Sequence, residues 1–334
     1  MLRKFLTRST QSSIAINFRK VSLSSSSIST ISPPEPMAPH LSDFRETIRR
    51  WVSKEIIPNV NEWEENGRVP RDIFRQAGEI GIFGVGYPEE YGGLGNHPCD
   101  LSVMMLVNEE LCRAGSGGLC AALSVHNISL PPIISLGSEE LKQKVVPAVL
   151  SGKKTMSLGV TEPSGGSDVA NMQTVATLID NDHYLVNGSK TFITGGMESD
   201  FITLAVRTGG SGPSGISLLC VEKGTPGLER TELMKAGWWC SDTATLHFDN
   251  MKVPKQNLLG TENNGFINVM KNFTISYQVN FIYEDSSENI SRIIDITMQS
   301  KNLHSLQKIL QGHSVDEDVE RNENAKSKIS DINS

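Results

Sequence analysis

The sequence predicts an α+β fold, in which an N-terminal helical domain is followed by a small antiparallel β-barrel or sandwich domain. Apolar residues recur at helical spacing from Leu41 to Leu150, and the spacing changes to strand-like alternation near Thr155. The β-rich runs that follow are short and closely spaced, with turn residues rather than helices between them. A chain of 334 residues also exceeds the usual size of one domain, so we expect two or three domains.

The first helix is predicted from an apolar face formed by Phe44, Ile48, Val52 and Ile56, and Pro58 ends the run. Further helices are expected over residues 73–80 (closed by Gly81), 100–114, 119–136 and 139–150, with a loop over 87–95. Strands are expected over residues 156–161, 175–179, 184–186, 201–207, 216–222 and 243–248. The pairs Asn181-Asp182 and Asn187-Gly188 have the composition of hairpin turns.

The composition argues against several classes of partner. A formal charge of -7 gives no basic surface for nucleic acid. No uninterrupted apolar stretch approaches the ~20 residues of a membrane-spanning helix, so we expect no membrane span. The cysteines are Cys99, Cys112, Cys120, Cys220 and Cys240. They lack paired metal-ligand spacing, so we expect reduced, mostly structural thiols and no metal.

The first 38 residues differ from the rest of the chain. Up to residue 34 the charged residues are all basic, namely Arg3, Lys4, Arg8, Arg19 and Lys20, and the first acidic residue is Glu35. A serine run follows, and prolines at 33, 34, 36 and 39 form a linker. This composition predicts a mitochondrial transit peptide; the alternative is a tail with a chance basic bias.

Two segments carry the chemistry. Residues 159–168 leave a short apolar run and turn on small residues, so backbone amides can approach a bound group, and Thr161 and Ser167 add hydroxyls. Residues 190–196 follow a strand and place an aromatic side chain and a hydroxyl beside a flexible turn. Without a ligand, these would be an ordinary strand-turn and a buried hairpin.

Together the two segments resemble the flavin-binding middle domain of the acyl-CoA dehydrogenases. The resemblance covers about residues 40–273, and near its end it looks closest to medium- and long-chain relatives. It includes residues 78–84, 87–95, 108–111, 137–142, 239–243, 253–260 and 262–266. Asn171 departs from the small residue usual at that position. The implied domains are a transit peptide and linker (1–38), a helical domain (39–155), a flavin-binding β domain (156–270) and a divergent, largely disordered tail (271–334).

The resemblance implies FAD as the cofactor and assigns roles by position. Residues 158–167 would line one side of the isoalloxazine ring, and Ser167 would also touch the acyl-CoA arm. Phe192 and Ile193 would pack on the ring face, with Thr194 near N5. The implied cofactor-binding residues are Leu158, Gly159, Val160, Thr161, Gly166, Ser167, Phe192, Ile193 and Thr194.

The reaction implied is α,β-dehydrogenation of an acyl-CoA thioester in fatty-acid β-oxidation in the mitochondrial matrix, with electron-transfer flavoprotein as partner. A carboxylate removes the α-proton while a hydride leaves the β-carbon for flavin. Glu162 would support the loop rather than act as the base, and no catalytic residue is assigned. His126 would line the acyl pocket or simply pack in the core. Trp238 and Trp239 would cover the site, or more simply fill the core.

The resemblance ends after Phe273. The family's later motifs, which hold the adenine side of FAD, form the homotetramer and usually supply the catalytic Glu, do not follow. Glu284 and Glu288 fall near the position of the base in some relatives, but their surroundings do not match. Two hypotheses follow: a flavoenzyme, or a non-catalytic member that acts at most as an interaction fragment. For turnover the sequence favours the second, with little flavin in the purified protein.

Overall fold

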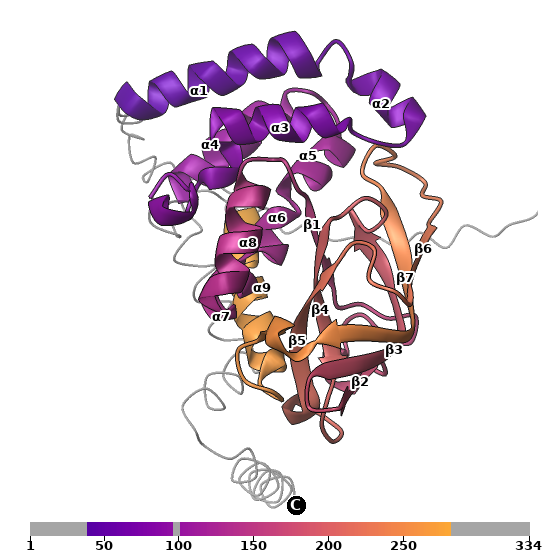
Figure 1. Ribbon diagram of the computed structural model, residues 1–334. Coiled ribbons are helices and arrows are strands. Elements are labelled where there is room, and N and C mark those ends of the chain that lie inside the picture. The colour runs from indigo at the N-terminus through magenta and orange to yellow at the C-terminus, as the bar shows by residue number, and fades with distance from the viewer. Residues whose placement is uncertain (1–38, 96–100, 282–334) are drawn as a thin grey trace, which may run out of the picture. The chain divides into compact units, whose positions relative to one another are not determined.

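The computed structural model describes residues 39–95 and 101–281 (Figure 1). The predicted leader, Cys99, Glu284 and Glu288 lie outside these residues. The first part of the described chain is helical, as predicted. Its elements are α1 (Pro39–Trp51), the π-helical turn η1 (Val52–Ile56), α2 (Val60–Asn66), α3 (Arg71–Ile80), the 3-10 turns η2 (Ile82–Gly84) and η3 (Glu89–Tyr91), α4 (Leu101–Cys112), α5 (Gly117–Ser124), α6 (His126–Ser129), α7 (Pro131–Leu136) and α8 (Glu139–Leu150).

Local chemistry accounts for the ends of these helices. Gly81 closes α3 in the left-handed conformation with φ 94°, as the sequence predicted for this glycine. Ser138 caps α8 by accepting a hydrogen bond from the Leu141 amide. The helix expected over 119–136 is three short helices, and Pro131 begins the last of them because its fixed φ suits a first helical position.

The second part of the described chain is a β domain, as predicted. Its strands are β1 (Met156–Gly159), β2 (Val175–Ile179), β3 (His183–Thr194), β4 (Phe201–Arg207), β5 (Ile216–Glu222), β6 (Leu228–Glu232), β7 (Thr243–Pro254) and β8 (Leu258–Leu259). Short 3-10 turns lie between them: η4 (Val169–Asn171), η5 (Pro213–Gly215) and η6 (Lys255–Asn257). The strand order β6-β7-β3-β2-β4-β5-β8 is an open path, and β1 joins it as a parallel partner of β4. The sheet is therefore mixed at β4 and antiparallel elsewhere. Helix α9 (Gly265–Phe281) follows it.

One predicted turn was wrong. Asn187 and Gly188 lie inside the long strand β3, at a register shift against β7. Gly188 alone of the pair has a positive φ, 138°, whereas a type I′ turn needs positive φ at both residues. The glycine is needed because a Cβ there would lie 2.7 Å from the Cα of Thr174. The neighbouring hairpin is a turn, as predicted, and it is Asp180 and Asn181 that have φ near 53° and 58°.

Strand β4 is shared between two hydrophobic cores. Phe201 and Ala205 belong to the core that also contains the helices, whereas Ile202, Leu204 and Val206 belong to the core inside the β domain. Both faces of the strand are therefore buried, which explains its continuous apolar sequence. The hydroxyl of Thr203 donates to the carbonyl of Ser129 in α6 at 2.7 Å, which ties the strand to the helices.

One described stretch, Gly117–Leu136, is long and apolar enough to cross a membrane by length and composition alone, with mean hydropathy 1.5. It had not been expected from the sequence, where Ser, His and Asn interrupt it. Its side chains Leu119, Leu130 and Ile133 are fully buried in the helical core. Core packing therefore accounts for its apolar character.

Candidate functional site

The two segments singled out by sequence lie side by side. The Thr191 amide donates to the Thr161 carbonyl at 2.9 Å, and the Lys190 ammonium donates to the Val160 carbonyl at 3.0 Å. These bonds join the end of β3 to the turn that follows β1, across about thirty residues of sequence. The strands thus bring both segments to one place, as the predicted common site requires.

A buried ion pair fixes the turn. Lys190 and Glu162 are 2.8 Å apart, with side chains 0% and 4% exposed. Glu162 also accepts hydrogen bonds from the amides of Gln173 and Thr174, at 2.6 and 2.9 Å. Its oxygens are therefore occupied by partners that hold the loop. This arrangement agrees with a supporting role for Glu162 rather than that of a base.

The pKa values of both partners are lowered, but for different reasons. Burial alone would raise the pKa of Glu162, but the charge and hydrogen bond of Lys190 and the backbone amides outweigh it and lower the pKa to about 2. Burial lowers the pKa of Lys190 to about 8, against the opposing effect of Glu162. Both values favour a charged pair at neutral pH.

Acidification is expected to destabilise the fold through Glu162. A carboxylate whose pKa is depressed to about 2 contributes stability above its unfolded value of ~4.3, and that contribution is lost as the pH falls toward 2. Urea unfolding at several pH values between 7 and ~3 measures this loss. The matched variant Glu162→Gln has no carboxylate at this position, so its stability should depend less on pH; equal slopes would contradict the assignment.

Phe192 is presented to solvent by a break in strand pairing. The register of β3 against β7 shifts between Lys190 and Ile193, and Phe192 in this bulge has φ 58°. Its side chain is 70% exposed, while Ile193 beside it is buried in the β core. A positive φ at a bulky residue costs on the order of 1–3 kcal/mol. The backbone thus keeps a large apolar ring outward, in a strained conformation, directly beside the Thr161 turn.

The glycine-rich turn is closed by its own backbone. Glu162 and Gly165 exchange two N–H···O bonds of 3.1 Å each. Beyond this bridge, Gly166 and Ser167 are exposed, and a Cβ at Gly166 would lie 3.5 Å from the methyl group of Thr161. Gly166 and Ser167 thus present an exposed stretch of this turn, which includes the Ser167 hydroxyl.

The other predicted contact residues divide into two groups. Gly159 and Val160 are buried, and a Cβ at Gly159 would lie 3.0 Å from Leu204. Leu158 and Thr194 are half-buried. The buried members anchor the site in the core, while the half-buried and exposed members form its surface.

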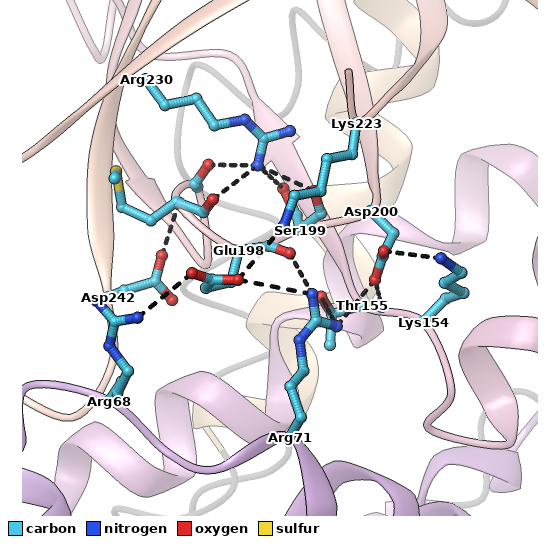
Figure 2. A network of polar contacts seen from close by, with 12 residues as sticks. Arg68, Arg71, Lys154, Thr155, Glu198, Ser199, Asp200, Lys223, Arg230 and Asp242 are labelled. Carbon is cyan, nitrogen blue, oxygen red and sulfur yellow. Dashed lines mark hydrogen bonds and ion pairs between the residues drawn. The ribbon is translucent and has the colours of Figure 1, made fainter. Parts of the chain in front are cut away.

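Residues that the sequence did not reveal hold the turn after Thr194 (Figure 2). Arg230 in β6 donates to the carbonyls of Gly196, Met197 and Ser199 at 2.9 to 3.0 Å. Asp242 accepts from the Met197 amide at 2.7 Å. This turn, residues 195–200, is thereby fixed from the β domain.

The same turn is held from the helical side. Figure 2 shows Arg71 of α3 reaching it from the opposite direction to Arg230. Arg71 donates to the Glu198 carbonyl and to Asp200, the latter at 2.8 Å, and Asp200 also pairs with Lys154 at 3.0 Å. The turn at residues 195–200 therefore connects the helices to the sheet, and we call it the seam.

A cavity of about 160 Å³ adjoins this seam. Ala122, Val125 and Met156 form apolar parts of its wall, and Arg68 and Asp242 contribute charge. Burial raises the pKa of Asp242. The volume is below the ~300–1,000 Å³ of a usual ligand pocket, so these residues alone do not enclose an acyl-CoA.

His126 and the two tryptophans take different positions. His126 is buried, packs against Phe83 in a tilted arrangement with ring centroids 4.5 Å apart, and pairs through Nδ1 with the Leu123 carbonyl. Burial lowers its pKa to about 4, as expected for a packing histidine. Trp238 and Trp239 are 64% and 50% exposed, so the prediction that they fill the core was wrong. Cys240 beside them is buried, as predicted.

Comparison with known proteins identifies the relatives of both described domains. Residues 39–153 match the family model "Acyl-CoA dehydrogenase, N-terminal domain", and residues 157–251 match "Acyl-CoA dehydrogenase, middle domain". A mitochondrial isobutyryl-CoA dehydrogenase of Bos taurus is 36% identical over 245 residues, which are 73% of this chain and 58% of the relative. The chain spans a little over half the length of the curated relatives that it matches.

Solved structures agree with these matches. A crystal structure of a probable acyl CoA dehydrogenase from Mycobacterium abscessus is 38% identical with a TM-score of 0.70, and the match covers 84% of this chain and 82% of that one. An acyl-CoA dehydrogenase complexed with FAD, from Bacillus anthracis, is 30% identical with a TM-score of 0.63, covering 74% of this chain and 40% of that one.

Proposed function

Because this chain belongs to the acyl-CoA dehydrogenase family, we propose that its two joined segments hold the isoalloxazine ring of FAD and serve α,β-dehydrogenation of an acyl-CoA thioester. The observation that carries the proposal is the Thr191–Thr161 hydrogen bond, which unites the glycine-rich turn with the strained, exposed ring of Phe192. An aromatic side chain held outward at a backbone cost fits a flat aromatic ligand.

Each group has a definite task in this proposal. Phe192 would pack on the ring face, while the hydroxyls of Thr161 and Thr194 and exposed amides near Gly166 would donate to its polar edge. Ser167, exposed on the same turn, would contact the ring and the acyl-CoA arm. Gly159, Val160 and Ile193 are buried and hold these groups in place. Bound FAD would supply hydride acceptance from the β-carbon.

The proton step needs a carboxylate other than Glu162. That group is buried against Lys190 and two amides, and its depressed pKa makes it a poor base. We propose electron-transfer flavoprotein as the electron acceptor. The Arg- and Ser-rich leader and the mitochondrial relatives support the mitochondrial matrix and fatty-acid β-oxidation as the setting.

The second candidate is a family member that keeps this fold without turnover, acting at most in interactions. The sequence from Thr274 onward favours it, because the family's later motifs do not occur there.

An absorbance titration separates the two candidates. The purified protein is mixed with FAD, and unbound FAD is removed. The protein is then treated anaerobically with acyl-CoA thioesters of several acyl-chain lengths. Retained flavin that is bleached by a thioester supports the enzyme. Retained flavin that is not bleached supports the second candidate. Little or no retained flavin also supports the second candidate, and it contradicts the proposed ring site.

A further inference from the structure

The corner between α4 and α5 brings two thiols together. The sulfurs of Cys112 and Cys120 are 3.9 Å apart, and both residues are free thiols. Cys112 is the last residue of α4 and is exposed, while Cys120 is half-buried in the first turns of α5. The connector between the helices, residues 113–116, includes Gly115 at φ 71°, with open space where a Cβ would stand. A disulfide needs a sulfur separation of about 2.05 Å, so the thiols must close by less than 2 Å.

We propose that Cys112 and Cys120 are a reversible oxidation site that forms an intramolecular disulfide when exposed to low-molecular-weight disulfides. The Cys112 thiolate attacks one sulfur of the small disulfide, which forms a mixed disulfide and releases one thiol. The Cys120 thiolate then attacks the Cys112 sulfur and releases the second thiol. The two cysteines lose two electrons and two protons, and the small disulfide is reduced to two thiols.

The surroundings favour this pair over the other described thiols. Cys220 and Cys240 are buried, 0% and 1% exposed, which keeps oxidants away from them. Burial and the neighbouring Cys112 raise the pKa of the Cys120 thiol. Cys112, on the exposed side, is therefore the entry point, and conversion of its thiolate into a neutral mixed disulfide removes the repulsion that opposes ionisation of Cys120.

The bridge would act on a structural joint. Ser116, in the same connector, caps α5 by accepting from the Leu119 amide at 2.9 Å and donates to Glu64 at 2.5 Å. The other oxygen of Glu64 accepts from the Cys240 amide at 2.9 Å. A disulfide at this corner would therefore form next to the contacts that join α2, α5 and the segment before β7.

Peptide mass spectrometry of the full chain tests the proposal. The protein is incubated with oxidised glutathione, the remaining thiols are alkylated, and the chain is cleaved after Glu110 and after Arg113. These cuts separate Cys112 from Cys99 and from Cys120. We expect a cross-linked pair of peptides, one containing Cys112 and the other Cys120. Its mass should be two hydrogen atoms below the sum of the two reduced peptides, and dithiothreitol should separate the pair.

Cysteine variants distinguish the proposed Cys112–Cys120 disulfide from stable glutathione attachment and from a disulfide to Cys99. Cys112→Ser and Cys120→Ser should each abolish the cross-link, and Cys120→Ser should instead retain glutathione on Cys112. Cys99→Ser, which keeps both proposed partners, should form the cross-link as the natural chain does. Persistent glutathione on Cys112 of the natural chain with Cys120 alkylated, or a cross-link to Cys99, would overturn the proposal.

Discussion

Replacing Lys190 by methionine is expected to lower the free energy of unfolding by about 3 kcal/mol, because it leaves the Glu162 carboxylate buried without its counter-ion. Methionine preserves most of the side-chain length but removes the ammonium, and with it the hydrogen bond to the Val160 carbonyl. The joint between the two segments depends on these contacts. Urea unfolding at neutral pH, followed by circular dichroism, measures the change.

The control is Lys252→Met on the neighbouring strand β7. Lys252 is exposed and pairs in register with Leu185 of β3, so the same chemical change is made on the same sheet without a buried partner. This variant should stay within about 0.5 kcal/mol of the natural chain. If the two variants were equally stable, the buried ion pair would not be what holds the turn.

Replacing Phe192 by glycine is expected to weaken flavin binding at least about fivefold without lowering the stability of the fold. The ring contributes little burial, since it is 70% exposed, and glycine adopts the φ of 58° without strain. The free energy of unfolding should therefore hold or rise by up to about 1 kcal/mol. Loss of stacking on a flavin should cost about 1–3 kcal/mol of binding. Flavin fluorescence titration and urea unfolding give the two readings.

Trp238→Gly is the matched control for Phe192→Gly. Trp238 is also an exposed aromatic residue at positive φ, 56°, and it lies outside the two segments. Its replacement removes a comparable ring and should leave flavin affinity within about twofold. If both variants lost the same flavin affinity, the contact with the flavin ring could not be assigned to Phe192 specifically.

Much of the fold could be predicted because local patterns determine it. Strands β2, β4 and β5 and helix α8 have the predicted bounds, since alternation or helical spacing continues to a clear turn or cap. Strand β3 was predicted too short because Asn187-Gly188 normally forms a turn. Here Gly188 lies at a register shift against β7 and leaves room for the backbone of Thr174. Strand β6 was missed because only Leu228 of its five residues is strongly apolar.

The candidate site was less accessible to sequence than the fold. The glycine-rich turn and Phe192 stand out in the sequence, and they lie together as the resemblance requires. The contacts of Arg71 and Arg230 with the turn at residues 195–200 join positions from 31 to 129 residues apart, and no local spacing indicates them. The outward orientation of Phe192 depends on a register shift that only the pairing of β3 with β7 creates.

The shared strand β4 has a thermodynamic consequence. Its alternate side chains belong to two different cores. If either core unfolds, the side chains on one face of β4 therefore lose their packing partners. The Thr203–Ser129 bond adds to this dependence. The helices and the sheet are therefore expected to unfold in a single cooperative transition. A destabilising substitution in either one should lower the melting temperature of both.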